Sequence, residues 1–433
     1  MGLSKKEKAM HHGQDEENIA HGEPAARKAS LLFFSHTFFF FGAGGCRSAT
    51  MSAATTLSES LVKLSTIPGR GRALVASRHI RPGEIILSDS PLLLYPAAFT
   101  PSPPTSFFCS YCFRSLLSVR LPCPTCSFAV FCSQYCLSAA LTSSHSPSLC
   151  RSLDVLPRIR DTDLRALAVF LLAASNLSST SPADFHRLLS LDGGDSSTAQ
   201  AEAVVLHSLV APLTGFSVDV TNALLAKDKR NAFGLMEPFR VEDAGERKVR
   251  AYGIYPNASL FNHDCLPNAC RFDYLDREGN GNTDIMVRAI HDIPEGREVC
   301  LSYFPVKWGY KERQQRLTED YGFRCSCDRC EVEKNWKDDA EESMEEEEED
   351  EGVEAMEEEG GEVGGEENND FPHAYFFVRY VCDQENCGGT MAPLPPQEKP
   401  SELMECNVCG RLRKQVDFVG EEGDVGNDII LDA

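Results

Sequence analysis

Cysteine is the residue type whose spacing in this chain most clearly indicates chemistry. The sequence contains 18 cysteines, and 15 of them fall into three tight clusters, which leaves only Cys46, Cys270 and Cys300 outside them. Pairs of thiols separated by about two to four residues are typical zinc ligands in a reducing compartment, whereas disulfide frameworks belong mainly to small secreted proteins. We therefore expect zinc, rather than disulfides, in all three clusters.

The first cluster, between Cys109 and Cys150, supplies eight zinc ligands in four closely spaced pairs. Eight ligands are enough for two closed tetrahedral sites, and the alternation of the pairs suggests that they are cross-braced. The alternative is a set of buried free thiols. One zinc ion would be held by Cys109, Cys112, Cys132 and Cys136, and the other by Cys123, Cys126, His145 and Cys150. This order of ligands resembles the MYND zinc finger.

The second and third clusters each predict one further zinc ion. Cys325, Cys327 and Cys330 leave a tetrahedral zinc one ligand short, and the lone Cys265 is the natural fourth ligand. The third cluster reads as a zinc ribbon, with paired surface thiols as the alternative; its members are Cys382, Cys387, Cys406 and Cys409. We therefore expect structural zinc ions at two sites in the finger, at a third site that includes Cys265, and at a fourth site in the ribbon.

Strands and a helical insertion must position these ligands. The stretch "ALVASRHIRPGEIILSDSPLLLYP" (residues 73–96) is rich in β-branched and leucine residues around an Arg-Pro-Gly-Glu turn, which predicts strands. Residues 161–175 predict a helix capped by Asp161 or Thr162, and helical sequence continues to about Lys227. Strands return at 285–289 and 298–303. The expected fold is therefore mainly β with an inserted helical segment.

The net charge of −23 is concentrated in one segment. Nineteen acidic residues and no basic ones lie in residues 338–370, so the rest of the chain is close to neutral. Like charges at that density repel one another, which predicts a solvated linker. The remaining sequence has no basic stripe for nucleic acid, so we expect neither direct nucleic-acid binding nor a DNA-binding zinc protein.

Residues 1–56 are expected to form a disordered leader. Its apolar run, residues 31–45, is too short to span a bilayer comfortably, so no membrane contact is expected. A signal-peptide core is the alternative, and translation could also begin at Met51. On either reading, residues 1–50 should be dispensable for folding and activity.

Four features in order resemble the SET-domain protein lysine methyltransferases of the SET-and-MYND (SMYD-like) type, closest to the plant ASHR group. They are "GRGRALVASRHIRPGEIIL", the inserted finger, "NASLFNHDCLPN" with "EVCLSY", and the cysteines of "YGFRCSCDRC". The resemblance implies a SET-domain β fold with an inserted MYND zinc finger, a zinc-binding post-SET strap and a small C-terminal zinc ribbon. The predicted domains are the leader 1–56, N-terminal SET part 57–108, MYND finger 109–150, helical SET insert 151–226, SET core 227–305, post-SET strap 306–330, acidic linker 331–370 and zinc ribbon 371–433.

The resemblance also implies S-adenosylmethionine as the methyl donor. The turn containing Arg70, Gly71 and Arg72 would lie along this donor, although the family often has glycine where Ala73 stands. Tyr303 would be the active-site tyrosine and would also contact the donor, and Phe233 would line the lysine channel. The other donor-binding residues would be Asn231, Asn262, His263 and Phe323. Taken singly, Tyr303 reads as a core tyrosine and Asn262–His263 as a satisfied turn.

The function implied is an S-adenosylmethionine-dependent lysine N-methyltransferase that acts on histones or other proteins as a chromatin regulator. The expected location is the nucleus, the cytoplasm or both, with a protein substrate, a proline-rich peptide at the finger and a monomeric state. The alternative is a non-catalytic adaptor built from the same modules in transcriptional regulation. Loss of the tyrosine or of the Asn-His pair would favour the adaptor, and both are present.

Overall fold

The computed structural model describes residues 60–98, 108–116, 120–126, 128–194, 200–241, 247–276, 281–336 and 373–414. The predicted leader and residues 337–370 of the predicted acidic linker lie outside this part of the chain. None of the helices within it is long and apolar enough alone to cross a membrane; Ala201–Thr214 and Val218–Asn231 pass the test only as a pair bent by 109°.

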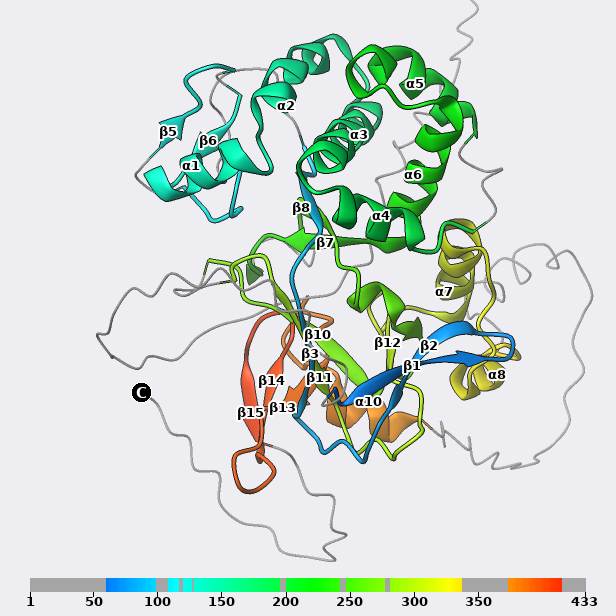
Figure 1. The fold of residues 1–433 in the computed structure, drawn as a ribbon. Coiled ribbons are helices and arrows are strands. Elements are labelled where there is room, and N and C mark those ends of the chain that lie inside the picture. The colour runs from blue at the N-terminus through cyan, green and yellow to red at the C-terminus, as the bar shows by residue number, and fades with distance from the viewer. Residues whose placement is uncertain are drawn as a thin grey trace, which may run out of the picture.

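Small sheets lie below the helices in Figure 1, from β7 and β8 in the middle of the picture downward, and we call strands β1–β4 and β7–β12 together the β core. Its strands are β1 (Val62–Ile67), β2 (Gly71–Ala76), β3 (Ile85–Asp89), β4 (Leu93–Pro96), β7 (Ala232–Met236), β8 (Val249–Ile254), β9 (Asn262–His263), β10 (Ala269–Asp273), β11 (Ile285–Ala289) and β12 (Cys300–Leu301). β1 and β2 form a hairpin, and the two three-stranded sheets have the orders β10-β11-β3 and β4-β8-β7. β9 and β12 pair in parallel, and the helical turn η5 (Ala258–Leu260) directly precedes β9.

The strand predictions are confirmed in outline. β11 spans residues 285–289 as expected, and three strands lie between Gly71 and Pro96. The strand expected over 298–303 is only two residues long, Cys300–Leu301. Before it, Glu298 forms an isolated bridge with Val75, and after Leu301 the chain leaves the ladder with β9. Tyr303 therefore lies beyond the end of the strand.

The finger occupies the upper left of Figure 1. It contains β5 (Leu121–Pro122), β6 (Val130–Phe131), α1 (Gln134–Thr142) and α2 (Pro147–Ser152), followed by the 3-10 helix η2 (Leu153–Arg158). The Ser133 hydroxyl caps α1 by accepting from the Cys136 N–H at 3.2 Å. This cap fixes the first turn of α1 and so the direction of the Cys136 side chain.

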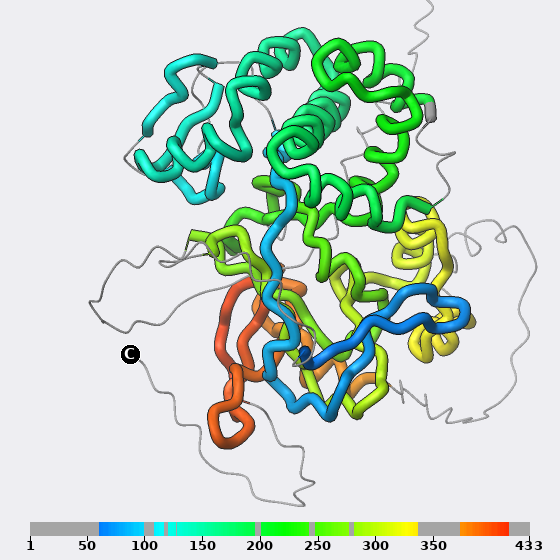
Figure 2. The backbone as a smooth tube through the Cα atoms, in the orientation of Figure 1, coloured from blue at the N-terminus to red at the C-terminus, as the bar shows by residue number. Residues whose placement is uncertain are grey.

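Helices form a layer above the β core (Figure 2). They are α3 (Thr162–Thr180), α4 (Pro182–Ser190), α5 (Gln200–Thr214) and α6 (Val218–Asn231). The predicted Asp161 cap of α3 is confirmed, since its carboxylate accepts from two backbone N–H groups at 2.9 Å. The buried faces of these helices share one apolar core with Tyr95, Tyr252 and Ile254 of the β4-β8-β7 sheet. The insertion is thereby fixed to the β core.

The strap and the C-terminal unit follow the β core in sequence. The strap contains α7 (Tyr310–Arg316), the π-helix η6 (Leu317–Tyr321) and α8 (Asp328–Glu333). The C-terminal unit, residues 373–414, contains α10 (Ala374–Tyr380), β13 (Met391–Pro393), β14 (Leu403–Cys406) and β15 (Leu412–Lys414) in one antiparallel sheet. The C-terminal unit packs against the β core: Phe376 and Met391 share an apolar cluster with Phe272 and Ile290. Figure 2 shows this unit in orange and red beside the strands of the β core.

Candidate active site and metal centres

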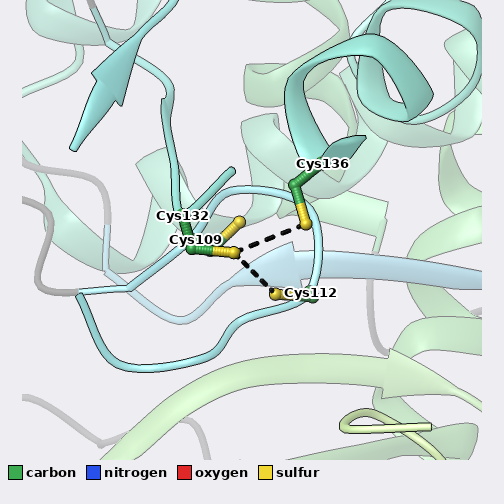
Figure 3. A group of neighbouring side chains, drawn as sticks. All are labelled: Cys109, Cys112, Cys132 and Cys136. Atoms are coloured by element: carbon green, nitrogen blue, oxygen red, sulfur yellow. Dashed lines mark hydrogen bonds between the residues drawn. The ribbon is translucent and has the colours of Figure 1, made fainter. Parts of the chain in front are cut away.

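The finger brings its eight predicted ligands together in the two sets expected from their spacing. In the first set, the sulfurs of Cys112 and Cys132 lie 3.7 Å apart and those of Cys132 and Cys136 3.5 Å apart. Figure 3 shows the four sulfurs of this set pointing toward one another, with Cys136 on the first turn of α1 and the others on loops. In sequence, Cys123 and Cys126 of the second set lie between the two halves of the first set. The two sites are therefore cross-braced.

The second set contains the one histidine ligand. The Cys123 and Cys150 sulfurs lie 3.7 Å apart, and the Cys126 sulfur lies 3.4 Å from His145 Nε2. Burial lowers the pKa of His145 to about 4, so its imidazole is neutral near pH 7. A neutral imidazole is the form that binds a metal ion.

The strap closes on Cys265, as the missing fourth ligand requires. The Cys265 sulfur lies 3.9 Å from that of Cys325 and 3.5 Å from that of Cys330, and Cys327 completes the group. Two side chains also donate to these sulfurs: Arg313 Nε to Cys265 at 3.3 Å, and Gln314 Nε2 to Cys330 at 3.2 Å. Such outer contacts orient metal ligands. The sequence analysis did not identify them.

The C-terminal unit forms the fourth group. The Cys382 and Cys409 sulfurs are 3.6 Å apart, and those of Cys387 and Cys406 are 3.5 Å apart. Gly389 has no room for a side chain, because an added Cβ would lie 2.4 Å from the Cys406 sulfur. The chain therefore passes close to this group only because glycine stands there.

All four groups fit zinc. Four ligands about 2.3 Å from a tetrahedral ion lie about 3.8 Å from one another, and the observed sulfur–sulfur separations are 3.5–3.9 Å. A disulfide would need about 2.05 Å, and the cysteines in the described part of the chain form none. Zinc has no open coordination position in such a closed set of four protein ligands, so these sites suit a structural role.

The Gly-Arg-Gly-Arg turn joins β1 to β2. Gly69 and Gly71 have φ angles of 75° and 73°, in the left-handed region that glycine adopts without strain. No atom lies within 4 Å of where a Cβ would stand on either residue. The turn therefore exposes backbone to open space, which suits close approach of a ligand.

Arg70 reaches from this turn to three partners, and its side chain remains 36% exposed. Its Nε lies 2.7 Å from Glu298 Oε2, and its Nη2 donates to the His263 carbonyl at 2.9 Å and to the Cys300 sulfur at 3.5 Å. Glu298 Oε1 also accepts from Asn262 Nδ2 at 2.8 Å. Glu298 thus ties the turn to β9, a role that the sequence analysis missed although Glu298 opens the quoted "EVCLSY".

Asn262 and His263 lie beside the turn but are already engaged. The Asn262 amide also donates to the Arg72 carbonyl at 3.1 Å. His263 Nδ1 accepts from the Tyr303 N–H at 3.1 Å, and its Nε2 lies 3.2 Å from the Cys265 sulfur. Burial lowers the pKa of His263 to about 3, so the neutral ring carries its proton on Nε2. The side chain of His263 thereby links Tyr303 to the strap, and both of its ring nitrogens are engaged in doing so.

Tyr303 lies where β12 has ended. Its hydroxyl donates to the Phe261 carbonyl at 2.9 Å, and its ring lies 4.7 Å from that of Tyr321 and 5.2 Å from that of His263. Burial raises the pKa of the Tyr303 phenol well above its usual range, so the hydroxyl stays protonated at neutral pH. A fixed, protonated phenol suits the orientation of a reacting group.

The remaining predicted residues come from three other elements. Asn231 ends α6, and its Nδ2 donates to the carbonyls of Asp192 at 2.7 Å and Lys227 at 2.8 Å. Phe233 on β7 is buried, with its ring edge-on to Tyr255 at 5.7 Å. Phe323, beside the strap cysteines, is 40% exposed. An exposed phenylalanine ring suits contact with an aromatic ligand.

Comparison with known proteins identifies the class of this fold and site. The SET domain family matches residues 71–304, which is more than half of the chain. The chain therefore belongs to the SET-domain family.

The relatives are named as lysine methyltransferases. "Histone-lysine N-methyltransferase ASHR2" of Arabidopsis thaliana is 50% identical over 388 residues, which cover 82% of this chain and 96% of that protein. "Histone-lysine N-methyltransferase SMYD3" of Homo sapiens is 26% identical over 61% of this chain and 60% of its own. A solved "SET domain of LSMT bound to Lysine and AdoHcy" is 15% identical with a TM-score of 0.30, covering 62% of this chain and 54% of that chain. A match that distant carries no argument about this site.

Proposed function

We propose that this protein transfers a methyl group from S-adenosylmethionine to the side-chain amine of lysine in a protein. The observation that carries the proposal is the position of Tyr303 beside the Gly-Arg-Gly-Arg turn and the Asn262–His263 strand, in a chain half identical to a histone-lysine N-methyltransferase over most of its length. The glycines of the turn, the end of α6 and Phe323 are the groups suited to hold the donor.

The reaction needs a neutral amine. When bound, S-adenosylmethionine supplies a methyl group on a positively charged sulfur. A free lysine is charged near pH 7, and its deprotonation there costs about 4 kcal/mol. Phe233, Tyr255 and Phe261 are buried in one hydrophobic cluster, and the Phe261 carbonyl accepts from the Tyr303 hydroxyl. Hydrophobic surroundings of this kind lower the pKa of an amine. The Tyr303 hydroxyl, fixed on the Phe261 carbonyl, is placed to orient that amine.

The four zinc groups take no part in this step. Each has four protein ligands, and the strap group acts on the site through contact: Cys265 meets His263, which in turn holds the Tyr303 backbone. The role of zinc here is to fix the strap and therefore the position of Tyr303 and Phe323.

The test is Tyr303→Phe, which removes one hydroxyl and little volume. Turnover should fall by a factor on the order of 10² or more, while donor affinity and melting temperature change little. Tyr380→Phe is the matched control, because Tyr380 is also buried but lies in the C-terminal unit. Unchanged turnover in Tyr303→Phe, with both variants folded, would remove Tyr303 from the reaction.

We further propose that the protein acts as a monomer on histone lysines as a chromatin regulator, in the nucleus, the cytoplasm or both, and that the finger binds proline-rich peptides. The ligand order of the finger supports the peptide site, and the named relative supports histone lysine as the substrate. Imaging of a fluorescent fusion, light scattering after gel filtration and titration with a proline-rich peptide test them separately. Exclusion from both compartments, a dimer, or no peptide binding would each contradict one of them.

A further inference from the structure

Strand β10 lies between the C-terminal unit and the sheet that carries Phe233. Successive side chains of a strand point to opposite faces. Cys270 and Phe272 belong to the apolar cluster that β10 shares with the C-terminal unit. Arg271, between them, reaches the other way, because its Nη2 donates to the Gly234 carbonyl on β7 at 2.9 Å. β10 therefore connects the C-terminal unit to β7.

Arg271 and Asp273 form a fully buried ion pair on β10. Arg271 Nε donates to Asp273 Oδ1 at 2.7 Å, and Arg271 Nη2 donates to Asp273 Oδ2. The two side chains are 0% and 1% exposed. Desolvation of two charges offsets most of their attraction, so a buried pair of this kind adds little net stability. What it adds is direction, because a guanidinium held at two atoms has a fixed orientation.

This fixed guanidinium lies over the Phe233 ring. The central carbon of the Arg271 guanidinium is 5.2 Å from the centre of that ring, within the range in which a cation is attracted to an aromatic face. Tyr255 meets the same ring edge-on at 5.7 Å. Gly253, opposite Phe233 in the ladder, makes room for this contact, since a Cβ there would lie 2.7 Å from the Tyr255 ring. The Phe233 ring is thus held by Arg271 and Tyr255 together.

The C-terminal unit fixes the backbone of β10 at the same residue. Asn407 Nδ2 donates to the Arg271 carbonyl at 3.0 Å, and Asn407 Oδ1 accepts from the Thr390 N–H at 2.8 Å. Asn407 is buried and directly follows Cys406, a member of the fourth metal group. A continuous set of contacts therefore runs from that metal group through Arg271 to Phe233.

We propose that Arg271 is a positioning residue of the lysine channel, which holds the Phe233 ring in place while Asn407 fixes the strand behind it. This inference rests on the proposed function, in which Phe233 lines the channel. A ring that is held in place both aligns the amine for the first transfer and restricts the space around it. Release of the ring should therefore slow the reaction and raise the share of lysine that receives a second methyl group.

The test replaces both charges at once, as Arg271→Met with Asp273→Leu, because Arg271→Met alone would leave a buried carboxylate unpaired. The full chain would act on a histone mixture with heavy-methyl S-adenosylmethionine. In this pair replacement kcat should fall about tenfold, as misplacement of a substrate-positioning group does. The KM for the donor should stay within about twofold, and the ratio of dimethyl to monomethyl lysine in mass spectrometry should rise about threefold or more.

A double-mutant cycle with Phe233→Leu distinguishes positioning from a general effect on the fold. If Arg271 acts through Phe233, the pair replacement should change kcat by less than about twofold in the Phe233→Leu background. Arg288→Met with Glu405→Leu is the matched control, because it removes another buried ion pair, one that joins β11 to the C-terminal unit. The control should leave kcat and the methyl ratio within about twofold of the wild type.

The outcomes separate this role from the proposed function. Unchanged kcat and methyl ratio in the pair replacement, or a tenfold loss that persists in the Phe233→Leu background, would overturn the positioning role and leave the proposed function intact. If the pair replacement does not fold, Arg271→Lys takes its place, since lysine keeps the charge without the two-atom contact, and the same two results decide. If the wild-type protein bound the donor but put no methyl on lysine, the proposed function and the positioning role would both be wrong.

Discussion

Removing the Glu405 carboxylate should destabilise the whole protein, because the C-terminal unit packs against the β core through one shared hydrophobic cluster. Glu405 Oε2 on β14 pairs with Arg288 Nη2 on β11 at 2.8 Å, and the two side chains are 5% and 1% exposed. The Arg288 guanidinium also lies 3.5 Å from the centre of the Phe272 ring. In Glu405→Ala this guanidinium would remain buried without its anion.

Breaking a buried ion pair in this way costs about 3–5 kcal/mol, a large part of a typical stability of about 5–15 kcal/mol. With a urea dependence of roughly 3 kcal/mol per molar, the unfolding midpoint should fall by about 1–2 M. The assay is urea unfolding of the full chain followed by circular dichroism. The sequence contains two tryptophans, Trp308 and Trp336, which lie just before α7 and just after α8. In the same experiment, their fluorescence reports whether the strap remains folded.

Glu402→Ala is the matched control, since Glu402 is exposed three residues earlier. It should change stability by less than about 0.5 kcal/mol. A loss below about 1 kcal/mol in Glu405→Ala would mean that water reaches Arg288. A separate early transition that leaves the strap signal intact would mean that the C-terminal unit unfolds independently of the β core. Either result refutes the reasoning.

Four further predictions concern zinc, the strap, the helix cap and pH. Elemental analysis should find four zinc ions per chain, and chelation should unfold the finger, because each structural site supplies roughly 10–16 kcal/mol; one zinc or none would contradict the assignment. Cys265→Ser should leave three zinc ions and weaken donor binding in calorimetry, and an unchanged zinc count would exclude Cys265 as a ligand. Asp161→Ala should lower the free energy of unfolding by about 1 kcal/mol in urea melts, because α3 loses two cap hydrogen bonds; no change would show that solvent replaces them. Since burial raises the pKa of Tyr303, kcat/KM should rise with the fraction of neutral lysine up to about pH 10, and a descending limb at lower pH in the rate profile would contradict a protonated tyrosine.

The metal ligands could be predicted from sequence because zinc imposes a local rule. Spacing alone assigned the alternating pairs of the finger, and a missing fourth ligand pointed to Cys265, whose sulfur lies 3.5 Å from that of Cys330. The Asp161 cap followed in the same way from residue type and position. Such inferences succeed where neighbours in sequence, or the count of ligands, determine the contact.

The contacts between distant segments could not be predicted. Glu298 meets Arg70 from 228 positions away, and Arg288 meets Glu405 across 117. In the sequence these residues look like ordinary surface charges, and only the packing of distant segments against one another brings them together. The same holds for His263, whose ring meets Tyr303 from 40 positions away and joins it to Cys265.

The most direct test of the central claim is the product of the wild-type reaction. The full protein would be incubated with a histone mixture and S-adenosylmethionine carrying a heavy methyl group, and the histones would be digested and sequenced by mass spectrometry. The account predicts the heavy methyl on lysine side-chain nitrogen, absent without enzyme and at least about 100-fold slower with Tyr303→Phe. Label on another residue type, or none on lysine in a protein that holds its zinc and binds the donor, would contradict it.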